Sequence, residues 1–129
     1  MPKRKLPRPT EGELAILRVL WRRGPSTVRE VHTELSPTQE TGYTTVLKLM
    51  QIMAEKGLVS RDESQKTHVY AAALEEAAAQ SQFLGHLLDR VFHGSAKDLV
   101  MQALSARKTS KAELAEIRKL IDQMERKSQ

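Results

Sequence analysis

The sequence predicts a mainly α-helical protein with one small β-hairpin wing: an N-terminal winged helix-turn-helix and a C-terminal helical dimerisation unit. Two observations predict this class. Three segments of helical periodicity precede two short β-prone runs, and three more helical segments complete the chain. The 129 residues, 40% hydrophobic and 29% charged, have the balance of a small globular protein. We expect a basic arm over residues 1–9, a winged-helix domain over 10–72 and a helical dimerisation domain over 73–129.

Two capping boxes open the first two expected helices. Residues 10–13 and 27–30 each place a threonine three positions before a glutamate, so that side chain and backbone can cap each other. The first helix should run to about Arg23, where a Gly-Pro pair stops it, and the second should run from Val28 to Leu35. A polar stretch then separates the second helix from the third.

The third helix should begin near Tyr43 and end at Lys56, with Gly57 as the left-handed residue that closes it. Two β-prone runs follow, over 58–61 and 67–70, and predict a hairpin with a charged tip. A hairpin of two short strands is only marginally stable by itself, so we expect it to pack on the helices. The expected buried face of the third helix is Val46, Leu49, Met50 and Met53.

The rest of the chain is helical in pattern. One segment extends from Leu74 to about Phe92, a second opens at the cap over 95–98, and a third opens at a capping box over 110–113. A unit of this size has barely enough core for itself, so its apolar stripes should be buried against a second copy of the chain. A monomer with this unit folded back on the first is the alternative. The expected dimer contacts are Leu84, Leu87, Leu88, Val91, Leu99, Val100, Leu104, Leu114, Ile117, Leu120, Ile121 and Met124.

The composition excludes several classes of protein. The absence of cysteine excludes a disulfide scaffold, a thiolate zinc site and a cysteine nucleophile. The longest apolar stretches, such as 71–74, are far shorter than the roughly 20 residues that span a bilayer. No apolar segment follows the basic start, so no secretory signal is expected. We therefore expect a cytoplasmic protein without membrane contact.

The net charge of +5 is concentrated at the N-terminus. Residues 1–9 carry four basic groups and no acidic one, residues 10–70 carry eight of each sign, and residues 71–129 carry nine basic and eight acidic groups. A basic, proline-rich arm suits contact with an anionic polymer such as nucleic acid. A solubilising end is the alternative for the arm alone.

Two capped helices, a polar turn and a third helix with a polar exposed side form a helix-turn-helix pattern, to which the hairpin adds a wing. The N-terminal end of such a third helix meets base edges and phosphates in the major groove. Lys48 or Gln51 can read acceptors on a purine edge, and hydroxyls can hold phosphate oxygens. The alternative is a protein-interaction module whose winged helix no longer reads DNA. The expected DNA contacts are Tyr43, Thr44, Thr45, Lys48, Gln51, Arg61, Lys66 and Thr27.

Neither an enzyme nor a cofactor is expected. There is no nucleophile-elbow sequence and no glycine-rich phosphate loop. His32 lies in the apolar stripe of the second helix and is expected to be a packed side chain. His86 and His93 are two helical turns apart and share a face, yet cannot hold one ion between them directly; a pair bridged across a dimer stays open.

The segments Tyr43–Met50 and Glu55–Val59, in this order and spacing, resemble the penicillinase repressor family. These are winged-helix repressors of β-lactamase, methicillin-resistance and copper-efflux genes. The resemblance covers about residues 10–125. It implies a homodimer in which each winged helix binds half of an inverted-repeat operator in double-stranded DNA. Further similar segments are Glu13–Trp21, Thr27–Val31, His68–Tyr70 and Gly94–Val100.

The sequence departs from the family pattern chiefly where the inducing signal acts. Several family members are cut by a partner protease at an Asn-Phe bond, and the corresponding pair here is Gln102-Ala103. A sensor or protease partner for induction therefore stays open. Ile52 stands where the family often has Arg or Asn, and Gln65-Lys66 replaces a Gly-Arg pair at the wing tip. We expect a weaker or altered wing contact with DNA.

Overall fold

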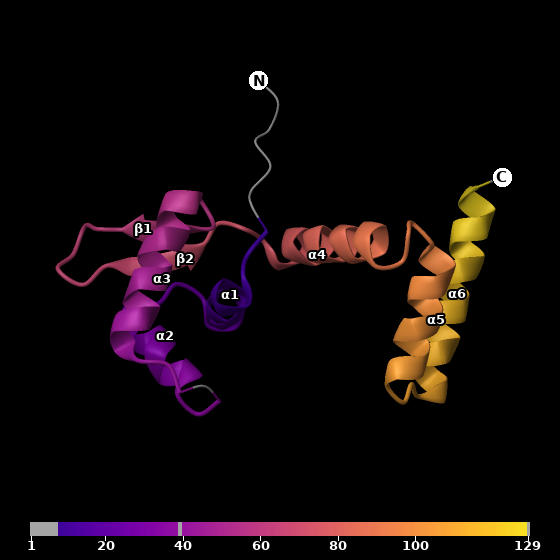
Figure 1. Cartoon of the computed structure of the whole chain (residues 1–129), viewed down its shortest axis with the longest axis horizontal. Coiled ribbons are helices and arrows are strands. Elements are labelled where there is room, and N and C mark those ends of the chain that lie inside the picture. The colour runs from indigo at the N-terminus through magenta and orange to yellow at the C-terminus, as the bar shows by residue number, and fades with distance from the viewer. Residues whose placement is uncertain (1–7, 39, 129) are drawn as a thin grey trace, which may run out of the picture. The chain divides into compact units, whose positions relative to one another are not determined.

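The computed structural model describes residues 8–38 and 40–128. Lys3, Arg4 and Lys5 of the expected basic arm lie outside the described residues. The chain is mainly α-helical with one two-stranded antiparallel hairpin, which confirms the predicted class (Figure 1). It divides into two compact units, Met1–Leu84 and Gly85–Gln129. The elements are α1 (Glu11–Arg23), α2 (Val28–Leu35), α3 (Tyr43–Lys56), β1 (Val59–Asp62), β2 (Val69–Ala72), α4 (Glu76–Arg90), α5 (Ala96–Ala106) and α6 (Lys111–Lys127).

Both expected capping boxes at the start of the chain are present. The Thr10 hydroxyl accepts from the Glu13 amide at 3.2 Å, and the Thr10 amide donates to the Glu13 carboxylate at 2.9 Å. Thr27 and Glu30 make the same two bonds at 3.2 and 2.9 Å. Because each cap satisfies amides that the helix leaves unpaired, the beginnings of α1 and α2 follow from local sequence.

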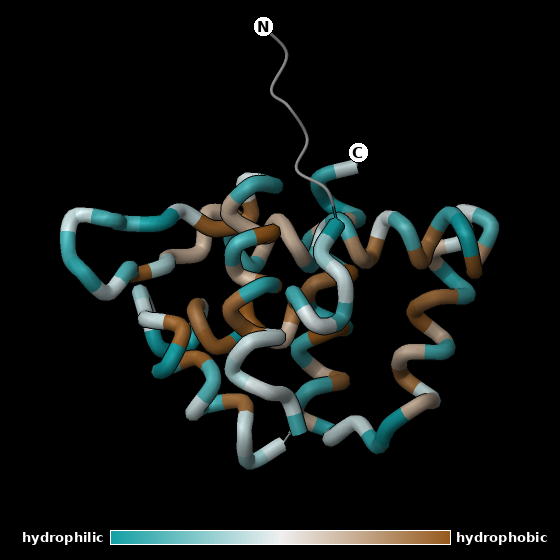
Figure 2. Tube along the Cα trace, turned by 60° about the vertical axis from the view of Figure 1, so that its left-hand side comes forward, coloured by the Kyte–Doolittle hydropathy of each residue, from teal (hydrophilic) through white to brown (hydrophobic). Residues whose placement is uncertain are grey.

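The core of the first unit lies between its three helices and the hairpin. Apolar side chains from α1, α2 and α3 meet there, and Leu49, expected on the buried face, is only half-buried at its edge. The Trp21 indole donates to the Leu74 carbonyl at 2.9 Å and so ties α1 to the segment after β2. Brown and teal positions alternate along the helices in Figure 2, as amphipathic helices require. The fully buried apolar side chains are Ile16, Leu17, Val31, Val46, Met50, Met53 and Leu58.

The strands are displaced from their predicted positions by one and two residues. β1 pairs with β2 from Val59↔Ala72 to Asp62↔Val69. Leu58, predicted to begin the first strand, instead belongs to the closing turn of α3, because its amide donates to the Met53 carbonyl at 2.9 Å. The tip is correspondingly shifted to residues 63–68, and the Asp62 carboxylate accepts from the Ser64 amide at its start.

A reciprocal backbone pair joins the start of α2 to the wing. The Ser26 amide donates to the Tyr70 carbonyl at 2.9 Å, and the Tyr70 amide donates to the Ser26 carbonyl at 2.8 Å. Tyr70 and Ser26 are both buried. This bridge fixes where the first residues of α2 lie relative to β2.

An ion pair between Lys56 and the buried Glu13 carboxylate joins the end of α3 to the beginning of α1. Lys56, the last residue of α3, donates to the Glu13 carboxylate at 2.8 Å, and Glu13 is only 1% exposed. Burial opposes ionisation of this carboxyl, but the hydrogen bonds from Lys56 and from the Thr10 amide outweigh burial and lower the pKa of Glu13. The pair thus links the beginning of α1 to the end of α3.

The helices after the wing carry their apolar side chains on open faces. α4 begins and ends two residues inside its predicted limits, since His93 and Gly94 adopt left-handed conformations after it (φ 51° and 80°). The Ser95 hydroxyl caps α5, as expected, and the Ser110 hydroxyl caps α6 through the first of the two bonds of the expected box. No residue of α5 or α6 is buried. Across the described ranges, no helix is long and apolar enough to cross a membrane.

Candidate nucleic-acid interface

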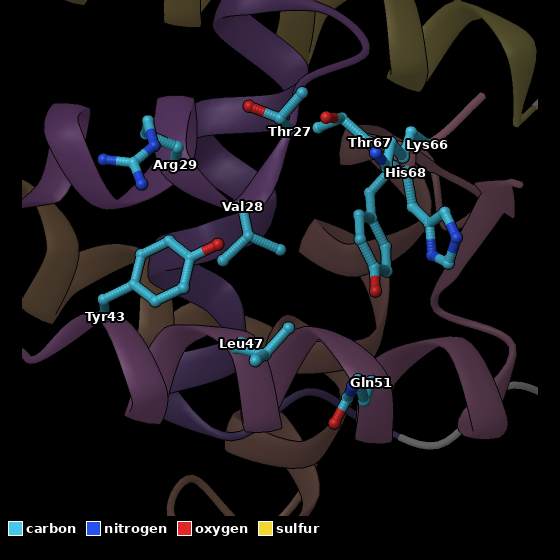
Figure 3. A pocket seen from close by; sticks show the side chains of 10 residues that line it. Thr27, Val28, Arg29, Tyr43, Leu47, Gln51, Lys66, Thr67 and His68 are labelled. Carbon is cyan, nitrogen blue, oxygen red and sulfur yellow. The ribbon is translucent and has the colours of Figure 1, made fainter.

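A groove of about 450 Å³ lies between the start of α2, one side of α3 and the wing (Figure 3). The Ser26–Tyr70 backbone bridge sets its width, because it holds α2 against β2. Its residues are mostly polar, and each of the three elements contributes. Thr27, Val28 and Arg29 come from α2 and its cap, Tyr43, Leu47 and Gln51 from α3, and Lys66, Thr67, His68 and Tyr70 from the wing.

The structure brings half of the expected DNA contacts together in this groove. Three others, Thr44, Thr45 and Lys48, are exposed on α3 outside the groove lining. Arg61 is exposed on β1 and also lies outside the lining. The expected contacts that do line the groove are Thr27, Tyr43, Gln51 and Lys66.

The hydroxyl and the amide of Thr27 both form hydrogen bonds within the protein. Its hydroxyl accepts from the Glu30 amide, and its amide donates to the Glu30 carboxylate. The carboxylate is therefore stabilised in its charged form, and the pKa of Glu30 lies below its usual value chiefly because of the Thr27 amide. Thr27 shapes the wall of the groove while its hydroxyl caps α2.

Tyr43, the first residue of α3, lies between two side chains of α2. The Arg29 guanidinium is 5.6 Å from the centre of the Tyr43 ring, a cation–π distance. The His32 ring meets Tyr43 edge-on, with 5.9 Å between centres. His32 also makes a 2.8 Å hydrogen bond with the Thr41 carbonyl, which confirms the expected packed histidine. These contacts fix the start of α3 on α2.

Arg61 is engaged by neighbours in the wing itself. It forms an ion pair with Glu63. A hydrogen bond with Tyr70, together with Glu63, raises the pKa of the Arg61 guanidinium. Its positive charge is thus partly compensated on the protein surface.

The other cations of the first unit fall into two groups. Arg22 and Arg23 pair with Glu34, Arg23 also pairs with Glu30, and Lys56 pairs with Glu13. By contrast, Arg29, Lys48 and Lys66 have no ion pair with a carboxylate within 8–38 and 40–128. Arg8 and Arg18, which lie outside the groove, have none either. Arg29 and Lys66 line the groove, and Lys48 lies on the exposed side of α3.

The residues of the groove that sequence reasoning missed are Val28, Arg29, Leu47, Thr67, His68 and Tyr70. Arg29 lies off the apolar stripe of α2, which was a signal of exposure, but the stripe does not say which element Arg29 faces. The expected shared face of His86 and His93 is wrong, because α4 ends at Arg90 and His93 lies in the left-handed turn beyond it. Within the described parts of the chain, no group of three metal-ligating side chains occurs.

The side chains expected at a dimer interface form a second type of surface. Eight of the twelve are exposed, among them Val91, Leu120 and Met124 at 58, 56 and 61%. The other four, Leu88, Leu99, Leu104 and Ile117, are half-buried. Met101, which the pattern did not single out, is also 58% exposed. Leucine and methionine side chains this exposed are unusual on the surface of a monomer when they are contiguous.

Comparison with known proteins finds one family. The family model described as penicillinase repressor matches residues 9–123. The chain is 32% identical to the transcriptional regulator BlaI of Mycobacterium tuberculosis, over 67% of this chain and 76% of that protein. It is 22% identical to the penicillinase repressor of Bacillus licheniformis, over 93% of this chain and 94% of that repressor. It is 18% identical to the methicillin resistance regulatory protein MecI of Staphylococcus aureus, over 88% and 92% of the two chains.

The solved structures that resemble part of the chain include two of BlaI. The solution structure of the DNA-binding domain of the repressor BlaI matches with a TM-score of 0.52 and 24% identity, over 58% of this chain and 92% of that one. The monomeric form of Bacillus licheniformis BlaI, in complex with the blaP half-operator, matches with a TM-score of 0.50 and 24% identity, over 57% and 90%. At this level of identity, the likeness shows the winged-helix fold.

Proposed function

The chain belongs to the penicillinase repressor family, and from that premise we propose that it is a dimeric, sequence-specific DNA-binding repressor of transcription. The family is one of repressors, which are not enzymes. The observation that carries the proposal is that three cations with no ion pair among the described residues, Arg29, Lys48 and Lys66, lie on or beside the exposed face of α3. A DNA-binding surface needs positive charge that the protein does not neutralise itself.

We propose that α3 enters the major groove. The exposed side chains of its first two turns include Thr44, Thr45 and Lys48, and the N-terminal part of a recognition helix is the part that meets base edges. Lys48 can donate to acceptors on guanine, and the threonine methyl groups can pack on a thymine methyl. On the wing side, Lys66 supplies a charge for a phosphate. Residues 10–72 would hold these contacts.

We propose that residues 73–129 join two copies of the chain. α5 and α6 bury no residue, although their apolar side chains recur with helical spacing. A second copy supplies a matching apolar surface, because the same face meets itself across a two-fold axis. Such a dimer presents two winged helices related by two-fold symmetry, which suits an inverted-repeat operator. We propose a cytoplasmic location, because the operator DNA that such a repressor binds lies there.

A salt series tests DNA binding. The purified protein is titrated onto a duplex taken from beside its own gene and onto a scrambled duplex of equal length, at several salt concentrations. We expect tighter binding to the first, and an affinity that falls steeply as salt rises. Lys48→Ala should weaken binding to the first duplex more than to the scrambled one. Equal, salt-insensitive binding to both would overturn the proposed function and favour a protein-interaction module.

Sedimentation of the full chain tests the dimer separately. We expect the mass of two chains at micromolar concentration, without DNA. A monomer at this concentration would overturn the dimer, and it would point to helices that fold back on their own winged helix.

A further inference from the structure

Arg29 is the cation of α2 whose charge is left uncompensated in the groove. Its side chain is exposed and lines the groove wall. Glu30 is its neighbour in the chain, but consecutive residues of a helix do not face each other. The Glu30 carboxylate accepts from the Thr27 amide and contacts Arg23. Within the described residues, no carboxylate forms an ion pair with Arg29.

The Arg29 guanidinium is held by the first residue of α3. It lies 5.6 Å from the centre of the Tyr43 ring, and Tyr43 also contacts the His32 ring in an edge-on arrangement. A cation–π contact with an aromatic ring leaves the donors at the edge of a guanidinium free and limits its rotamers. A guanidinium group whose conformation is already restricted loses less conformational entropy when it binds an anion.

Arg29 and Lys66 lie on opposite sides of the groove, one on α2 and one on the wing (Figure 3). A ligand that spans both must carry negative charges at both edges, with room between them for the α3 side chains of the groove, Tyr43, Leu47 and Gln51. The sugar-phosphate backbones on either side of a DNA groove have this form. Arg61, which the sequence suggested as the second wing contact, is instead paired with Glu63.

We propose that Arg29 binds a DNA phosphate, and that Tyr43 positions it for this contact. The inference rests on the proposed function and adds to it a contact from α2, outside the third helix. A phosphate contact strengthens binding to every sequence alike, whereas a base contact strengthens binding only to the operator. This difference makes the role of Arg29 measurable.

The main experiment compares Arg29→Gln with Arg18→Gln in the full chain. Arg18 is exposed on α1, has no ion pair within the described residues and does not line the groove. Both variants lose one charge, so Arg18→Gln controls for net charge. Binding is measured on the duplex from beside the gene and on the scrambled duplex, over a salt series. Thermal unfolding followed by circular dichroism verifies that both variants fold.

We expect Arg29→Gln to weaken binding to both duplexes by the same factor, and to reduce the salt slope by about 1 per bound chain. Arg29→Lys should keep the slope, because it keeps the charge. Arg18→Gln should resemble the unmodified protein. Equal behaviour of Arg29→Gln and Arg18→Gln would overturn the inference. A loss confined to the gene-flanking duplex would also overturn it, since Arg29 would then read a base.

The role of Tyr43 is tested by a double-mutant cycle. Tyr43→Phe keeps the ring and should keep the slope, whereas Tyr43→Ala should weaken binding to both duplexes. If Tyr43 acts by positioning Arg29, Tyr43→Ala should cause little further loss of DNA affinity in a chain that already carries Arg29→Gln. Fully additive losses would overturn the positioning role. If the unmodified chain binds neither duplex, the proposed function itself fails, which is a different result from normal binding by Arg29→Gln.

Discussion

The two compact units share one sequence pattern and differ in what covers it. Among residues 8–38 and 40–128, the fifteen buried hydrophobic residues all lie between Ile16 and Ala79, in α1 to the beginning of α4. α5 and α6 have equally regular apolar spacing and bury nothing. The difference teaches that amphipathic periodicity predicts which face of a helix avoids water, but not which element covers that face. In the first unit the neighbouring helices and the wing cover the apolar faces. In the second unit we propose that a second copy of the chain covers them.

The strongest test of this comparison is the same substitution in each unit. Leu17 is 0% exposed in the core, so Leu17→Ala should lower the free energy of unfolding by about 3 kcal/mol. Leu120 is 56% exposed, so Leu120→Ala should leave the unfolding of the winged helix unchanged. Urea unfolding of the full chain, followed by Trp21 fluorescence, measures both. Equal losses in the two variants would contradict the comparison.

The same Leu120→Ala variant should act on assembly instead. Two copies of the side chain are lost from one dimer, and covering the exposed part of each leucine is worth about 1 kcal/mol, so the dimer should weaken by about 2 kcal/mol in all. Sedimentation at several concentrations measures this shift. Leu17→Ala is the control here: it should weaken the fold and leave the dissociation constant of any folded dimer unchanged. An unaltered Leu120→Ala dimer would remove Leu120 from the interface.

The accuracy of sequence reasoning also differs between local and tertiary features. The limits of α1, α2 and α3 were predicted correctly, because caps such as Thr10, Thr27 and Gly57 act within one turn. The strands were displaced, because pairing begins only where Leu58 is released from the end of α3. The change at Leu58 from helix closure to strand pairing depends on tertiary packing, and no periodicity in the sequence marks it.

The groove shows the same limit at the candidate site. Residues of α3 were identified from its polar face, since that face follows from helical spacing. Arg29 was missed, because its position over Tyr43 depends on how α2 packs on α3. The pairing of Arg61 with Glu63 was also missed, because it depends on the conformation of the hairpin tip. The sequence predicts which charged side chains are exposed, but it does not predict which side chain each of them contacts.

A third test concerns the buried ion pair that has no counterpart in α5 or α6. Glu13→Gln removes the charge that Lys56 contacts at 2.8 Å and should cost about 2 kcal/mol of unfolding free energy at neutral pH. The pKa of Glu13 is lowered on folding, so its stabilisation is complete above the ordinary value of 4.5 and is lost as pH falls through the lower folded value.

Urea unfolding from pH 7 down to about pH 3 measures this dependence. The difference between Glu13→Gln and the unmodified protein should shrink as the pH falls below about 4.5. A difference that stays constant with pH would mean that Glu13 stabilises through packing, not through its charge. Glu116→Gln on α6, where the glutamate is exposed, is the matched control and should change neither quantity.

The smallest expected effect comes from one helix cap in each unit. Thr27→Ala removes the hydroxyl that accepts from the Glu30 amide, and such a loss costs about 1 kcal/mol. It should lower the stability of the winged helix by this amount, because α2 is fixed there by the core and by the Ser26–Tyr70 bridge. Thr27→Ser, which keeps the hydroxyl, should restore most of the loss.

Ser110→Ala removes the equivalent bond to the Glu113 amide, yet its effect should appear in a different measurement. α6 has no buried residue, so fraying of its first turn breaks no core contact in its own chain. We therefore expect an unchanged transition for the winged helix and a dimer weakened by about 0.5 kcal/mol, the low end for a cap. If Ser110→Ala destabilised the winged helix as much as Thr27→Ala does, α6 would have to be packed within its own chain. The distinction between a self-covered unit and a partner-covered one would then be wrong.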